Sequence, residues 1–298
     1  MKICPKCGTK YTNEELQFCL EDRTPLAHDG PPTEALEDEQ PTQFKGTVEP
    51  LPEMNEQPEM SEIATVGNIF FEPERTFKDL RRKPRFIIAG IIIALFVTAY
   101  TFAISIKVGE DVIRRATAEA IDQRAPNLDK DQKEAQVNIS MKINGYVRYA
   151  VPIFVFISFF IGGLLYWAGA KAFGGTGTFM QNVSVWVYAG LAPAVIAMTA
   201  NLIVLMMKSA DDIDLAASQR GLIHANPSFF IDGKAHNFLA TFLSTFDVFA
   251  IWGWILAAIG LSVVNKMSKG AAWTLVIIIV VIGLGFRLVG TMFSGNPN

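Results

Sequence analysis

Residues 86–106 read FIIAGIIIALFVTAYTFAISI and contain no charged side chain. An α-helix of about 20 residues, rising ~1.5 Å per residue, crosses the ~30 Å hydrocarbon layer of a bilayer. The stretch is apolar on every side, which suits a helix surrounded by lipid rather than a helix half exposed to water. It therefore predicts a transmembrane helix and a membrane-embedded fold.

Four further runs are predominantly apolar and at least as long as the first. They cover residues 150–170, 180–207, 238–264 and 271–293. In the whole chain 50% of the residues are hydrophobic and 18% are charged, against about 25% charged in soluble domains, and the mean hydropathy is +0.28. The sequence predicts an all-α polytopic membrane protein, a five-helix transmembrane bundle within a membrane domain at 61–298. A soluble globule, a disordered chain and a disulfide framework do not fit this composition.

Lysine and arginine gather on one side of the predicted bilayer. They stand before the first span, between the second and third spans, and between the fourth and fifth: Lys78, Arg81, Arg82, Lys83, Arg85, Lys171, Lys266 and Lys269. Positive residues near span ends favour the cytoplasm, and the chain opens without the apolar core of a secretory signal. We expect a multi-pass protein, of a bacterial cytoplasmic membrane, with the N-terminus cytoplasmic and the C-terminus outside.

The segments between the predicted spans also carry patterns. Across 61–85, apolar residues recur at helical spacing on both sides of Pro73, which predicts a short amphipathic helix on the bilayer surface. The first long connection, 107–149, has a helical period over 109–124 and an apolar–polar alternation over 137–143 that predicts a short strand. With the N-terminus inside, this connection and the one at 208–237 face outward.

All three cysteines stand near the start of the chain. Residues 4–7 read CPKC, and residues 19–22 read CLED, with an aspartate where a second cysteine is expected. Paired knuckles of this spacing suit a tetrahedral structural zinc site. The predicted ligands are Cys4, Cys7, Cys19 and Asp22, and His28 is a looser candidate for the fourth position.

The N-terminal region, 1–26, resembles the small zinc ribbons found ahead of many bacterial membrane and regulatory proteins. The alternative is a ribbon that has lost its metal or holds it poorly. A thiol redox role is disfavoured because no thioredoxin-like βαβ pattern surrounds the CxxC motif.

Residues 27–60 predict an extended disordered linker. The segment holds six prolines and an acidic excess against one basic residue, Lys45. Such a segment cannot bury enough apolar surface to offset its chain entropy. We interpret it as a spacer, with an acidic docking tail for a basic partner as the alternative.

Sequence motifs of common enzymes, such as HExxH, Walker A and G-x-S-x-G, are absent from the sequence. Two charged residues fall inside predicted spans, Asp247 in the fourth and Arg287 in the fifth. A charge at the bilayer centre costs at least ~2.5–3.5 kcal/mol, so an intramembrane structural pair is predicted. The alternatives are a proton or ion pathway and two separate polar pockets.

The membrane part resembles the Yip (Ypt/Rab-interacting protein) integral membrane family. The resemblance lies in NIFFEPERTFKDLRRKPRF at 68–86, in Tyr188-Ala189 followed by Pro193, and in DVFAIW at 247–252 with the SKG turn at 268–270. It covers about 66–293 and agrees with five spans. Eukaryotic members act in vesicle trafficking and bind small GTPases, a role that the resemblance does not assign to any residue here.

The sequence therefore favours a non-enzymatic membrane-organising or partner-recruiting scaffold with a cytosolic zinc-ribbon module. The expected partners are the lipid bilayer and an unknown protein bound through 1–60. No nucleic acid is expected, and a homo-oligomer is possible. The alternative is a small-solute or ion transporter that uses the region of Asp247 and Arg287.

Overall fold

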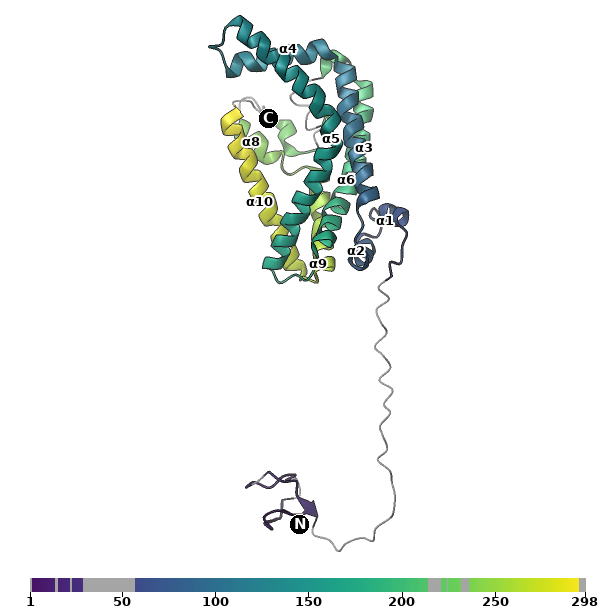
Figure 1. Ribbon diagram of the computed structural model, residues 1–298, viewed down its shortest axis with the longest axis vertical. Helices are drawn as coiled ribbons and strands as arrows, with labels where there is room; N and C mark the ends of the chain where they lie inside the picture. Colours follow the sequence, from purple (N-terminus) through teal and green to yellow (C-terminus); the bar gives the residue numbers. More distant parts are fainter. Residues whose placement is uncertain are drawn as a thin grey trace. The chain divides into compact units, whose positions relative to one another are not determined.

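The structure is a computed structural model that describes residues 2–13, 16–21, 23–28, 57–213, 221–223, 225–231 and 236–294. The chain divides into two compact units, Met1–Met54 and Asn55–Asn298. Figure 1 shows the elements of both units.

The N-terminal unit contains three short strands, β1 (Lys2–Ile3), β2 (Lys10–Tyr11) and β3 (Ala27–His28). The strand β1 lies in the middle and pairs antiparallel with both neighbours. Because β3 begins at Ala27, the sheet continues past residue 26, where the sequence placed the end of the ribbon. Units of fewer than ~40 residues seldom bury enough surface to be stable without a disulfide, a metal or a partner.

The membrane unit is helical. Its helices are α1 (Glu62–Asn68), α2 (Pro73–Arg82), α3 (Ile87–Val108), α4 (Glu110–Arg124), α5 (Lys130–Ala172), α6 (Phe179–Met207), α8 (Asn237–Leu243), α9 (Val248–Asn265) and α10 (Lys269–Ser294). In the described part of the chain, five of them are long and apolar enough to cross a membrane: α3, α5, α6, α9 and α10. The predicted five spans are confirmed.

The centre of the bundle is α6, which packs against α3, α5 and α9. It begins with a capping box, in which the side chains of Thr178 and Gln181 each accept a backbone N–H of the other residue. Its large side chains are buried around much of its circumference: Val183, Val185, Val187, Tyr188 and Leu191. The other four spans keep many apolar side chains exposed for lipid.

The segment before the first span differs from its prediction. Two helices, α1 and α2, replace one, and α2 packs against α9. Phe77 and Leu80 of α2 are fully buried. The prediction that this apolar face lies on the bilayer surface was therefore wrong, because α9 offers a protein surface that covers it.

The strand predicted over 137–143 was also wrong. These residues belong to α5, a helix of 43 residues and thus about 65 Å long. Figure 1 shows α4 lying along the first part of α5, at the opposite end of the bundle from α1 and α2. Val137 is buried, and Met141, one turn later, contacts Thr117 of α4, whereas Ile139 and Ile143 are exposed. The side chains that face α4, Val137 and Met141, are four residues apart, which is a helical spacing. The apolar–polar alternation over 137–143 therefore led to a wrong prediction.

The predicted fourth span, 238–264, is interrupted. The short helix α8 ends at Leu243, and α9 begins at Val248. Asp247 is the N-cap of α9, and its side chain accepts the backbone N–H of Phe249. The aspartate therefore lies at the end of this spanning helix and not well inside it.

Candidate functional site

Two loops of the same shape hold the cysteines. In the first, the N–H of Cys4 donates to the carbonyl of Thr9 at 3.0 Å, and Gly8 donates to the carbonyl of Cys4 at 2.9 Å. In the second, Cys19 donates to Thr24 at 2.8 Å and Arg23 donates to Cys19 at 3.0 Å. The residue before each threonine, Gly8 or Arg23, has a positive φ, of 72° or 57°. Sequence spacing suggested this repeat, and the backbone hydrogen bonds confirm it for the described residues of both loops.

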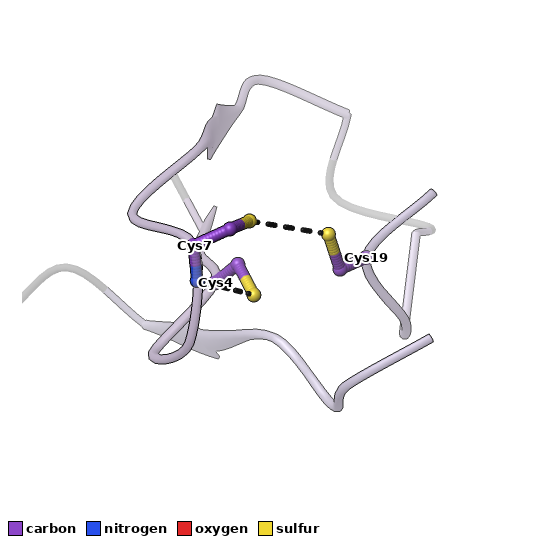
Figure 2. Close-up of side chains that lie close together, drawn as sticks. All are labelled: Cys4, Cys7 and Cys19. Carbon is purple, nitrogen blue, oxygen red and sulfur yellow. Dashed lines mark hydrogen bonds between the residues drawn. The ribbon is translucent and has the colours of Figure 1, made fainter. Parts of the chain in front are cut away.

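The two loops bring three sulfur atoms together. Figure 2 shows Cys4, Cys7 and Cys19 converging on one point, and their Sγ atoms all lie within 4.8 Å of one another. The Sγ atoms of Cys7 and Cys19 are 3.5 Å apart, and the Cys7 N–H lies 3.5 Å from the Cys4 Sγ. Cys4 and Cys19 are buried and Cys7 is exposed.

The thiols differ in their surroundings. Burial raises the pKa of the Cys4 thiol above its ordinary value. Hydrogen bonding by Thr9, whose Oγ1 lies 3.3 Å from the Cys7 Sγ, lowers the pKa of Cys7. Tyr11 places its hydroxyl 3.2 Å from the Cys19 Sγ, and this contact raises the pKa of the tyrosine. The thiol of Cys7 therefore ionises more readily than the thiol of Cys4.

The three sulfurs can hold one metal ion. Zinc–sulfur bonds of ~2.3 Å in a tetrahedron separate the sulfurs by ~3.8 Å, close to the spacing found here. The fourth predicted ligand, Asp22, and the side chain of His28 lie outside the described residues. In the sequence, Asp22 occupies the position in the second loop that Cys7 occupies in the first.

A second polar cluster, which the sequence did not predict, ties α1 and α2 to the bundle. Arg85 forms an ion pair with Asp79, and both side chains are almost completely buried. Arg85 also donates to the Thr65 hydroxyl at 2.8 Å, and Asp79 accepts the backbone N–H of Glu59 at 2.6 Å. The sequence counted Arg85 only as one of several positive residues near the first span.

Further hydrogen bonds on the same side of the bundle join residues far apart in the sequence. Arg81 donates to the carbonyl of Val263 at 3.2 Å, and Gln181 donates to the carbonyl of Arg81 at 2.6 Å. Asn182 of α6 and Asn265 of α9 exchange side-chain hydrogen bonds of 3.1 and 2.9 Å. Because these amides are buried and paired, they fix how α6 and α9 meet.

The predicted pair of Asp247 and Arg287 meets different partners in the structure. Arg287 of α10 donates to the hydroxyls of Thr245 and Ser244 at 3.1 and 2.7 Å. Asp247 accepts from the Asn226 amide at 3.3 Å and caps α9. The ion pairs formed among the described residues do not include one between these two. The α8–α9 interruption nevertheless places both side chains in one polar neighbourhood.

These features define a polytopic α-helical membrane protein with a small cysteine-bearing unit at its N-terminus. The Yip1 domain family model matches residues 67–290. The chain belongs to the Yip1 domain family, as the sequence resemblance predicted.

Membrane protein YknW of Bacillus subtilis is similar to this chain, with 33% identity over 139 residues. The similar stretch covers 47% of this chain and 54% of that protein, so the chain spans about half the length of the curated relative it matches. No solved structure matches the chain.

Proposed function

We propose that the protein is a non-enzymatic membrane scaffold that recruits a cytosolic protein partner through its N-terminal unit. Cys4, Cys7, Cys19 and Asp22 hold a structural zinc ion, and the five spans hold this module at a bacterial cytoplasmic membrane. The N-terminus is cytoplasmic and the C-terminus is outside. The observation that carries the proposal is the convergence of three thiols in a small unit, Met1–Met54, that is separate from the membrane unit.

The surface of the small unit supports a role in protein binding. Phe18 and Leu20 flank the buried Cys19, and their exposed fractions are 54% and 75%. A metal at Cys19 would fix the backbone between these two apolar side chains. Fixed, exposed apolar residues are typical anchors of protein–protein contacts.

The attachment of the linker supports the same role. Glu59, near the end of the acidic segment, forms an ion pair with Arg82 of α2, and its N–H donates to Asp79. The chain that leads from the linker is therefore held against the membrane unit from residue 59 onward. The described part of the N-terminal sheet ends at His28, so the residues between 28 and 59 connect the recruiting module to this contact.

Quantitative crosslinking in native membranes tests the proposal. A partner of the N-terminal unit should be lost when Phe18 and Leu20 are both replaced by serine, and when Cys7→Ser removes a metal ligand. The matched control is Phe71→Ser, which alters an aromatic side chain of the membrane unit with an exposed fraction of 85%. Equal crosslinking of every partner in all variants would contradict the proposal.

A second candidate function is transport of a small solute or ion. The observation that favours it is the interruption between α8 and α9, next to which Arg287 and Asp247 lie. Interrupted helices with polar side chains mark the substrate sites of many transporters. Flux in proteoliposomes that is abolished by Asp247→Ala, in a variant that still folds, would establish transport. Absence of flux, together with loss of partner crosslinks in the N-terminal variants, would favour the scaffold.

A further inference from the structure

A pocket lies between α4 and the start of α5 in the membrane unit, and its lining includes no residue of α8 or α9. Its volume is about 580 Å³, within the ~300–1,000 Å³ range of small-molecule sites. Leu128 and the buried Val137 give it an apolar part. The lining residues of α5 precede the apolar part of that helix. They belong to the end of the membrane unit at which Figure 1 shows α4 beside α5.

Positive charge dominates the lining. The cationic side chains are Arg114, Arg115, Lys130 and Lys133, and the acidic ones are Asp122 and Glu134. Four cations and two carboxylates leave an excess of two positive charges.

Only part of this positive charge is used within the protein. Lys133 forms an ion pair with Asp122 at 2.8 Å, and Arg114 donates to the neutral Asn138 side chain at 2.7 Å. Within the described residues, Arg115 and Lys130 have neither an ion pair nor a side-chain hydrogen bond, although they line the same pocket. Like charges held together in one concavity raise the local concentration of anions.

We propose that this pocket binds a small ligand through a phosphate group. A phosphate monoester carries about two negative charges near neutral pH, which matches the excess of the lining. Arginine forks and lysine ammonium groups bind phosphate oxygens, and the apolar residues accommodate the carbon part of the ligand. The source of the phosphate is either a soluble phosphate monoester or the headgroup of an anionic lipid.

The test uses the full-length protein in phosphatidylcholine nanodiscs and titrates sn-glycerol 3-phosphate by calorimetry. Saturable binding is expected, with glycerol inactive. Arg115→Gln and Lys130→Gln should each weaken binding roughly tenfold, the loss of one hydrogen bond to a charged group. Glu134→Gln should strengthen binding several-fold because it removes a carboxylate from the lining.

The matched control is Lys142→Gln, which removes an exposed cation of the same helix outside the pocket. Its affinity should stay within about twofold of the unaltered protein, since general attraction by net charge is weak at physiological salt. A loss equal to that of Arg115→Gln would overturn the proposal. Helical content and thermal midpoint confirm that each variant is folded.

A second arm separates the two sources of phosphate. Nanodiscs that contain phosphatidic acid should raise the thermal midpoint of the unaltered protein, but not of Arg115→Gln, if the headgroup is the ligand. Binding of glycerol phosphate without this lipid effect identifies a soluble ligand. If neither source binds in a way that depends on Arg115 and Lys130, the pocket is not a phosphate site.

Discussion

Asp79 and Arg85 are six positions apart, with Pro84 between them, and their ion pair is the most buried in the described part of the chain. This spacing is not one at which side chains of a helix meet. The contact forms because α2 ends at Arg82 and the chain turns before α3 begins. A residue that the sequence marked only as a positive charge thus has a structural role.

We expect Arg85→Met and Asp79→Leu each to lower the free energy of unfolding by about 3–5 kcal/mol, because each leaves a buried charge without its partner. The double variant should recover much of the loss. Denaturant titration in detergent measures the change. The exposed pair of Lys78 and Glu74 serves as control, since breaking it should cost only ~0–1 kcal/mol.

The metal site gives a second prediction for single residues. The full-length protein purified under reducing conditions should contain about one zinc ion, and Cys7→Ser should lose it. Asp22→Cys should bind zinc more tightly, because a thiolate is the softer donor and would make the second loop equal to the first. Metal analysis with competition by a chelator measures both. Zinc absent at neutral pH would refute the predicted ligands.

Two glycines in the spanning helices, Gly163 and Gly283, have different surroundings. A Cβ atom added to Gly163 of α5 would lie 2.7 Å from the Cα of Val183 in α6. Nothing lies within 4 Å of the equivalent atom at Gly283 of α10. Both glycines lie inside apolar spanning helices, and only the packing of the bundle separates their roles.

Gly163→Ala should therefore destabilise the bundle by about 1–3 kcal/mol through overpacking against α6. Gly283→Ala should be neutral or slightly stabilising, since alanine favours a helix more than glycine does. Thermal unfolding in detergent compares the two variants. Equal losses would mean that α5 and α6 do not approach as closely as the structure has them.

The start of α9 gives another prediction for elements. Asp247→Ala should cost about 0.5–2 kcal/mol because it removes the N-cap. Arg287→Leu should also destabilise the protein, since it leaves the hydroxyls of Ser244 and Thr245 without their donor. Because Asp247 and Arg287 have separate partners, the losses of stability in the two single variants should add in the double variant. Recovery of stability in the double variant would instead establish the ion pair predicted from the sequence.

For the whole molecule, the orientation of the spans is a prediction from the distribution of lysine and arginine. A fluorescent protein fused before residue 1 should be fluorescent, and alkaline phosphatase fused after residue 298 should be active, because the enzyme requires the outer side of the membrane. An inactive phosphatase fusion at the C-terminus, with an active one placed between α9 and α10, would reverse the orientation.

The membrane class, the five spans, the family and the paired cysteine loops could all be predicted from the amino-acid sequence. Each of these depends on local properties, namely the length of an apolar run or the spacing of a short motif. Contacts between distant parts of the chain were needed to show that α2 packs on α9, that 137–143 is helical, and that α9 begins at Val248. The ion pair of Asp79 and Arg85 is likewise a result of the tertiary structure. The energy of a buried charge depends on neighbours that only the folded chain brings into contact.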